Sequence, residues 1–152
     1  MDGSNKEGLL FVGVGLYEYD VAIKDELKKK YNVFYVNSND FKKRFGVLYR
    51  LFSFFHFGRL NDLLSSKLLH NRIRNIPQNA VSRVLIIKGE YLTSEILRTI
   101  KERNNRITSF NLYLWDAWDN HKNKDVLEKG FEKIFSFDTK DCRERGFILR
   151  PL

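Results

Sequence analysis

Two short stretches of the sequence place carboxylates beside residues that could position a ligand. Residues 88–90 (KGE) set a cation and a carboxylate on either side of a glycine, and residues 115–119 (WDAWD) interleave two tryptophans with two aspartates. A carboxylate can take a proton from a bound hydroxyl, and a glycine lets a ligand approach the main chain. The alternatives are a solvated turn, helix-capping aspartates, and tryptophans packed between a sheet and a helix. The candidate site residues in these stretches are Lys88, Gly89, Glu90, Trp115 and Asp116.

A third candidate is the glycine-containing turn at residues 13–18 (GVGLYE). A dinucleotide-binding motif needs a small residue at its third position, and Glu18 stands there instead. A tight turn between strand and loop is therefore the favoured interpretation, and we expect no nicotinamide cofactor. Gly15 and Tyr17 remain candidates for contacting a substrate. Asp138, which stands before Thr139, is a further candidate, with a helix cap as the alternative.

Metal binding is not indicated. The three histidines, His56, His70 and His121, are scattered without the spacing of metal ligands. The single cysteine, Cys142, permits no internal disulfide, so we expect it only to pack.

Short apolar runs alternate with amphipathic stretches of helical period, which is typical of an α/β protein with a parallel sheet. The first run, residues 9–14, is continuously apolar, as expected of a strand buried on both faces. We predict a three-layer α/β/α sandwich of five or six mostly parallel strands in the order 2-1-3-4-5(-6). The predicted strands are residues 9–14, 32–36, 84–87, 110–114, 133–137 and a start at 147; the predicted helices are residues 19–30, 94–103, 124–129 and 139–145.

Loops that leave the carboxyl ends of parallel strands build the binding crevice of such a sheet. Here those loops span residues 15–18, 37–40, 88–91, 115–120 and 137–140. All the candidate site residues named above fall within them, so we expect these residues along one edge of the sheet.

The segment from Asp40 to Asn75 is long, basic and helical in pattern, and predicts two helices separated near residues 56–59. Between Asp40 and Ile76, eight basic residues face two acidic ones, so this part of the chain holds +6 of the net +8. We expect its apolar stripe to be the core face of a helix covering the sheet, with an anionic membrane surface as the second explanation. Nucleic acid comes last, since no recognised binding motif is present. The stripe consists of Phe41, Phe45, Leu48, Leu51, Phe52 and Phe55.

Length and composition predict one folded domain. The chain has 152 residues, of which 43% are hydrophobic and 14% aromatic. No apolar run reaches the roughly 18 residues of a membrane span, and the first residues lack the apolar core of a signal peptide. We therefore expect a cytoplasmic protein, peripheral at the inner face of the membrane if the basic segment binds lipid.

Three stretches together resemble a known family: residues 84–97 (VLIIKGEYLTSEIL), 110–120 (FNLYLWDAWDN) and 131–152 (FEKIFSFDTKDCRERGFILRPL). They are similar to the N-terminal half of bacterial glycosyltransferases of capsule, exopolysaccharide and lipopolysaccharide biosynthesis, related to the CgeB-like spore-maturation family. The resemblance covers about the second half of the chain. From Leu9 to Val36 it holds only as a pattern.

The resemblance implies a two-domain GT-B transferase in which each half is Rossmann-like. The C-terminal half of such enzymes binds the nucleotide-sugar donor, and the N-terminal half binds a saccharide or lipid-linked acceptor. Residues 1–152 match only the acceptor half, as a single domain, so we expect no activity from them alone. Sugar rings stack on aromatic faces, and carboxylates accept hydrogen bonds from their hydroxyls. Asp116 or Glu90 is thus the expected base or acceptor anchor, with Trp115 as a wall.

Two other functions remain open. One is a stand-alone flavodoxin-like or receiver-like module that binds a ligand without catalysis. The acidic cluster of a phosphorylated receiver is missing, since Gly13, Val14 and Gly15 follow the first strand. The other is a nucleotide-binding oxidoreductase, which Glu18 disfavours. The sequence stops as a sixth strand begins, which suggests that the chain is a fragment, or at least that a further domain once followed.

Overall fold

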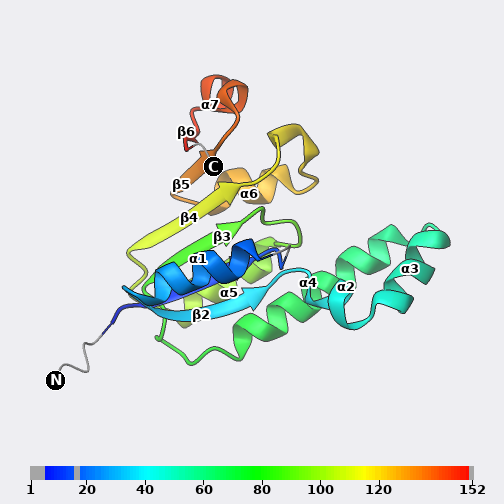
Figure 1. Cartoon of the computed structure of the whole chain (residues 1–152), viewed down its shortest axis with the longest axis horizontal. Helices are drawn as coiled ribbons and strands as arrows, with labels where there is room; N and C mark the ends of the chain where they lie inside the picture. Colours follow the sequence, from blue (N-terminus) through cyan, green and yellow to red (C-terminus); the bar gives the residue numbers. More distant parts are fainter. Residues whose placement is uncertain (1–5, 16–17, 151–152) are drawn as a thin grey trace.

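The structure, a computed structural model, describes residues 6–15 and 18–150. Figure 1 shows a sheet with helices packed against it and a group of helices that extends away from it. The sheet has six parallel strands in the order β2-β1-β3-β4-β5-β6, as predicted for a Rossmann-like fold. The strands are β1 (Gly8–Gly13), β2 (Asn32–Asn37), β3 (Arg83–Ile87), β4 (Ser109–Leu114), β5 (Lys133–Ser136) and β6 (Ile148–Leu149).

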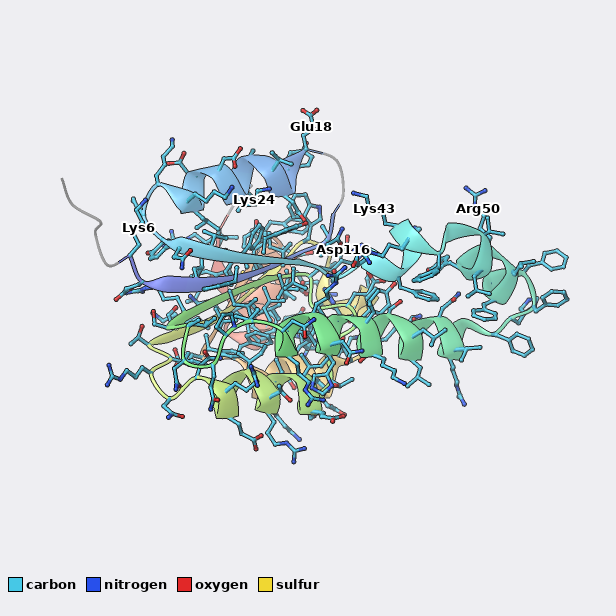
Figure 2. All side chains as sticks on the ribbon, turned by 90° about the horizontal axis from the view of Figure 1, so that it is seen from below. Lys6, Glu18, Lys24, Lys43, Arg50 and Asp116 are labelled. Atoms are coloured by element: carbon cyan, nitrogen blue, oxygen red, sulfur yellow. The ribbon has the colours of Figure 1, made fainter. Side chains whose placement is uncertain are left out.

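Helices cover both faces of the sheet, α1 on one side and α4 and α5 on the other (Figure 2). The helices are α1 (Tyr19–Lys28), α2 (Asp40–Arg44), α3 (Gly46–Phe54), α4 (Gly58–Arg74), α5 (Ser94–Arg103), α6 (Lys124–Gly130) and α7 (Thr139–Arg145), with a 3-10 turn, η1 (Trp118–Asn120). The boundaries outside residues 40–75 agree with the sequence-based prediction to within about two residues.

The larger core lies on the face of α4, α5 and α6. There Leu69, Ile100 and Leu127 belong to one buried cluster with the buried side chains of β4, whose side chains alternate between buried and partly buried. The smaller core gathers Phe11 and Ile87 under α1. Because β1 contributes to both cores, almost its whole length is buried, as its continuous apolar run predicted.

Helix ends follow the predicted capping chemistry. The Thr93 hydroxyl accepts a hydrogen bond from the Ile96 amide at 3.3 Å and begins α5. Gly146 ends α7 with a left-handed φ of 70°, a conformation that glycine adopts without strain.

The segment from Asp40 to Asn75 differs from the prediction. It forms three helices, because the chain turns at Phe45 between α2 and α3, and the predicted break near residues 56–59 separates α3 from α4. The expectation that its apolar stripe packs in the core is wrong: Phe41 is buried, but Phe45, Leu48, Leu51 and Phe55 are exposed. The reason is that α3 lies beyond the sheet, where it packs mainly against α2 and α4 (Figure 1).

We call residues 40–63 the arm. Its base is fixed by Asp40, whose carboxylate pairs with Arg44 at 3.1 Å and with Arg72 of α4 at 3.0 Å. Further out, the Asn61 amide donates to the Tyr49 carbonyl at 3.2 Å and to the Ser53 hydroxyl at 3.1 Å. These contacts hold α2 and α3 against α4 without burying the stripe.

Candidate functional site

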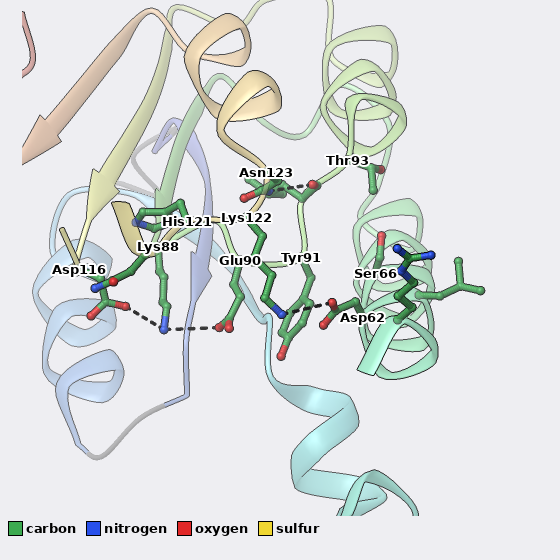
Figure 3. Close-up of a pocket in the computed structure, with 14 residues that line it drawn as sticks. Asp62, Ser66, Lys88, Glu90, Tyr91, Thr93, Asp116, His121, Lys122 and Asn123 are labelled. Atoms are coloured by element: carbon green, nitrogen blue, oxygen red, sulfur yellow. Dashed lines mark hydrogen bonds and ion pairs between the residues drawn. The ribbon is translucent and has the colours of Figure 1, made fainter. Parts of the chain in front are cut away.

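A cavity of about 600 Å³ lies where α4 passes the carboxyl ends of β3 and β4. Its walls are the turn after β3, the loop after β4, and one side of α4 (Figure 3). This is the edge at which open parallel sheets bind ligands. The lining residues are Arg59, Asp62, Leu63, Ser66, Lys88, Glu90, Tyr91, Leu92, Thr93, Asp116, Asn120, His121, Lys122 and Asn123.

Lys88 joins the two candidate carboxylates. Its Nζ lies 2.9 Å from Asp116 Oδ2 and 3.5 Å from Glu90 Oε2, as the dashed lines of Figure 3 show. The three side chains are between 24% and 39% exposed, so they are partly shielded yet reachable from the cavity. The structure thus brings together residues that the sequence separates by more than two dozen positions.

The backbone of the turn after β3 is unusual. Lys88 and Gly89 both adopt left-handed conformations, with φ values of 67° and 70°. The Lys88 amide still donates to the Tyr113 carbonyl of β4 at 2.8 Å, so the chain turns sharply as soon as the ladder ends. A left-handed lysine is strained, and such strain is commonly stored at functional sites.

Gly89 has a packing role. A Cβ at this position would lie 2.9 Å from Leu127 Cδ2 and 3.2 Å from Leu92 Cδ1, so the glycine faces the core, not the cavity. Asn123 fixes the turn from the other side, since its amide donates to the carbonyls of Gly89 at 2.9 Å and Leu92 at 3.0 Å. The Gly89 carbonyl is therefore already paired within the protein, and Gly89 is not among the residues that line the cavity.

The charged groups of the site stabilise one another's ionised forms. Burial by itself lowers the pKa of Lys88, but the hydrogen bond with Asp116 and the nearby charge of Glu90 outweigh it, so the pKa lies above its ordinary value. Lys88 is consequently a cation at neutral pH. It presents N–H donors to the cavity while the two carboxylates present acceptors.

His121 stands behind this group and is 7% exposed. Burial lowers its pKa below the ordinary 6.5, more than a backbone hydrogen bond and the charge of Asp116 raise it. The imidazole is therefore neutral at neutral pH. Among the described residues, its Nε2 atom has no hydrogen-bond partner, nor has the buried Oδ1 atom of Asn123.

The mouth of the cavity is bridged by a second ion pair. Lys122 Nζ, from the loop after β4, lies 3.5 Å from Asp62 Oδ2 on α4 (Figure 3). Tyr91 forms the adjoining wall and lies beside Tyr49 of the arm. Burial, followed by the charge of Glu90, raises the pKa of Tyr91, so its hydroxyl keeps its proton. Both contacts join the cavity to α4 and the arm.

The two tryptophans lie outside the cavity. Trp115 packs edge-on against Tyr19, with ring centroids 5.5 Å apart, beside the smaller core under α1. Trp118 is buried: its amide donates to Asp141 Oδ2 at 2.7 Å, and its ring packs against Phe147. The alternative of tryptophans that pack between elements is thus the arrangement in the structure.

The remaining predicted residues lie elsewhere along the same edge. Asp138 caps α7, since its Oδ1 atom accepts hydrogen bonds from the amides of Lys140 at 2.7 Å and Asp141 at 3.4 Å. Gly15 has a left-handed φ of 64° at the end of β1, and Tyr17 lies outside the described residues. Neither Asp138 nor Gly15 lines the cavity.

The corner at the end of β1 is closed by the protein's own polar groups. Asp20, a buried residue of α1, accepts hydrogen bonds from the Gly15 amide and the Tyr35 hydroxyl, each at 2.7 Å. In dinucleotide-binding folds this helix N-terminus receives a pyrophosphate. Here a carboxylate occupies that position, which supports the expectation that no nicotinamide cofactor binds there.

Sequence reasoning missed several cavity residues. His121, Lys122 and Asn123 directly follow the predicted loop after β4, so extending that loop by three residues would have included them. Nothing in the sequence indicated that α4 lines the cavity. Arg59 and Asp62 lie in a segment whose path over the sheet edge depends on tertiary packing.

The described residues contain no group of three or more His, Cys, Asp or Glu side chains that could hold a metal ion. Among them, no helix is both long and apolar enough to cross a bilayer. Comparison of the chain with family models, curated proteins and solved structures gives no match. The chemistry of the cavity therefore carries the functional argument.

That chemistry suits a neutral ligand with many hydroxyls. Carboxylates accept hydrogen bonds from hydroxyls, while Lys88 and the side-chain amide of Asn120 can donate to their oxygens. Aliphatic and aromatic walls from Leu63 and Tyr91 offer surfaces for the apolar C–H faces of a ring.

Proposed function

We propose that this chain is the acceptor-binding domain of a glycosyltransferase of cell-surface polysaccharide biosynthesis, which transfers a sugar from a nucleotide-sugar donor. The observation that carries the proposal is the Lys88 group: a cation between Glu90 and Asp116 on the wall of a cavity of about 600 Å³. A cavity of that volume accommodates a small saccharide. The resemblance of residues 84–97 and 110–120 supports the same conclusion.

The reaction requires one acceptor hydroxyl to lose its proton as its oxygen attacks the anomeric carbon of the donor. The new glycosidic C–O bond forms while the bond to the nucleotide phosphate breaks, and the nucleotide leaves with the bonding electron pair. Asp116 or Glu90 receives the proton or anchors the acceptor. Both carboxylates pair with the charge of Lys88, which fixes their positions. Anchoring needs a fixed hydrogen-bond acceptor, whereas a base needs a free carboxylate. The ion pairing therefore favours the role of anchoring the sugar over the role of base.

In this proposal the nucleotide-sugar is held by a second Rossmann-like domain outside residues 1–152. The acceptor is a saccharide or a lipid-linked saccharide, and the protein is cytoplasmic and peripheral at the inner face of the membrane. The exposed apolar stripe and the +6 charge of the segment around the arm support that location.

The proposal is tested by amide NMR titration of residues 1–152 with a panel of common bacterial monosaccharides and disaccharides at millimolar concentration. We expect chemical-shift changes at the cavity loops, around Tyr91 and Asn120. Asp116→Asn should weaken binding at least about tenfold, since one lost charge-assisted hydrogen bond is worth about 1.5 to 3 kcal/mol.

Asp119→Asn is the matched control, because Asp119 lies in the same loop, pairs with Lys124 at 3.2 Å and does not line the cavity. It should leave saccharide binding unchanged. Equal losses in both variants, or no shift with any saccharide of the panel, would count against the proposal. Binding of a nucleotide or another planar ligand at Tyr91 would favour the stand-alone ligand-binding module.

A further inference from the structure

The outer end of the arm exposes a cluster of apolar side chains. Phe54 is 76% exposed and Val47 75%, although both belong to a well-formed helix. We call the cluster the aromatic tip; it comprises Val47, Leu51, Phe54, Phe55 and Phe57. Aromatic rings splay outward at the end of the arm in Figure 2. Contiguous exposed apolar surface of this kind marks an interaction site.

The aromatic tip is part of an ordered structure. The turn between α3 and α4 passes through His56 in a left-handed conformation, with a φ of 60°, and the Phe57 amide donates to the Phe52 carbonyl at 2.7 Å. Asn61 ties α3 to α4 just behind the turn. Polar contacts therefore assemble the arm while the phenylalanines of the aromatic tip stay outside, so the exposure of these side chains does not come from a frayed helix.

Cationic side chains lie along one side of the arm. Lys43 and Arg50 point the same way from the arm in Figure 2, and neither has an ion-pair partner among the described residues. Both acidic residues of the segment are already paired, Asp40 with Arg44 and Arg72, and Asp62 with Lys122. Among the described residues, the charge without an ion-pair partner along this side of the arm is thus cationic.

We infer that the aromatic tip inserts into an anionic lipid bilayer while Lys43 and Arg50 contact the phosphates of its headgroups. Phenylalanines beside cations are the pattern of interfacial helices. A second copy of this chain fits the tip less well, because two arms of like charge would repel one another. The inference names the membrane element of the proposed function and rests on that proposal for its biological role, but not for lipid binding itself.

The position of the tip relates it to the cavity. Phe57 immediately precedes α4, and Arg59, Asp62 and Ser66 of that helix line the cavity within the next few turns. A bilayer that receives the tip therefore lies beside the cavity mouth. A saccharide on a lipid anchor could enter the cavity while its hydrocarbon chain stays in the bilayer.

The test is sedimentation of residues 1–152 with vesicles of phosphatidylglycerol or of phosphatidylcholine, at low and at high salt and without any sugar. We expect binding to phosphatidylglycerol that weakens as salt rises. The triple variant Phe54→Ser, Phe55→Ser, Phe57→Ser should lower the partition coefficient by at least about tenfold. Lys43→Gln with Arg50→Gln should remove most of the preference for the anionic lipid.

The matched control removes three exposed apolar side chains far from the arm: Val21→Ser, Ile148→Ser and Leu149→Ser. It should bind vesicles like the parent, and circular dichroism melts verify that each variant is folded. The inference fails if the parent ignores phosphatidylglycerol at low salt, or if the phenylalanine variant binds as well as the parent. It also fails if sedimentation velocity finds a dimer that only that variant loses. Since no sugar is present, these outcomes are independent of saccharide binding in the cavity.

Discussion

Replacement of Lys88 separates its two roles, as a strained turn residue and as the cation of the cavity. Lys88→Met keeps the left-handed backbone, with its φ of 67°, and removes the charge between Glu90 and Asp116. Lys88→Gly removes the same charge but also relieves the strain, because glycine adopts this conformation readily. The two variants should therefore differ in stability while sharing one defect in ligand binding.

The magnitudes follow from exposure and conformation. Glu90 is 39% and Asp116 35% exposed, so solvent screens both ion pairs, and their joint loss should lower the free energy of unfolding by about 1 kcal/mol. Relief of the left-handed strain should raise the free energy of unfolding of Lys88→Gly by about 1 to 2 kcal/mol. The added freedom of glycine in the unfolded chain should lower it by about 0.5 to 1 kcal/mol. Lys88→Met should thus be about 1 kcal/mol less stable than the parent, and Lys88→Gly within about 0.5 kcal/mol of it.

Urea unfolding followed by circular dichroism measures both differences, and NMR titration measures saccharide binding. Both variants should lose binding equally. If Lys88→Gly is destabilised by more than about 2 kcal/mol, the turn is not strained in the way argued. If Lys88→Met still binds saccharides like the parent, Lys88 is only a surface residue of the turn.

Three further outcomes are expected. Gly89→Ala should lower the free energy of unfolding by about 2 kcal/mol or more in urea, because the new methyl group meets Leu127 at 2.9 Å and φ is 70°; a change below about 0.5 kcal/mol would contradict that packing. His121, whose pKa lies below 6.5 in the folded protein because of burial, binds its proton more readily when unfolded, so it contributes stability above pH 6.5 that is lost as pH falls. Urea midpoints between pH 7.5 and 5 should therefore fall less in His121→Gln than in the parent, and identical slopes would refute this. Residues 1–152 alone should bind no nicotinamide dinucleotide by calorimetry and transfer no sugar, so micromolar binding or measurable transfer would show the expectation to be wrong.

The strand order was predictable because local chemistry and global packing agree there. The continuous apolar run of β1 is typical of a strand covered on both faces, and Thr93 and Gly146 mark helix ends by their own side-chain and backbone preferences. With the strands and helices placed, the handedness of the connections leaves few arrangements of a parallel sheet.

The candidate site was predictable only in part. Lys88, Glu90 and Asp116 follow adjacent strands, so parallel pairing alone brings them together. The direction of Trp115 was not predictable, since one step along the chain at the end of a strand turns a side chain to the other face.

The arm was the least predictable part. An apolar stripe of helical period indicates that the helix packs against another apolar surface. It does not indicate whether that surface is the sheet of the same chain or a binding partner. Only the path of α3 beyond the sheet edge decides that question, and that path depends on the ion pairs of Asp40 and on Asn61.

The Asp20 side chain takes the place that a bound anion would have at the end of β1. Its Oδ2 atom accepts hydrogen bonds from the Gly15 amide and the Tyr35 hydroxyl, so these two donors of the β1 corner are already paired within the protein. Ligand-induced stabilisation depends on binding to the folded state, and donors that already pair with a carboxylate have little to gain from an added anion. A thermal-shift screen of this protein should consequently be insensitive to nucleotides and phosphates at that corner.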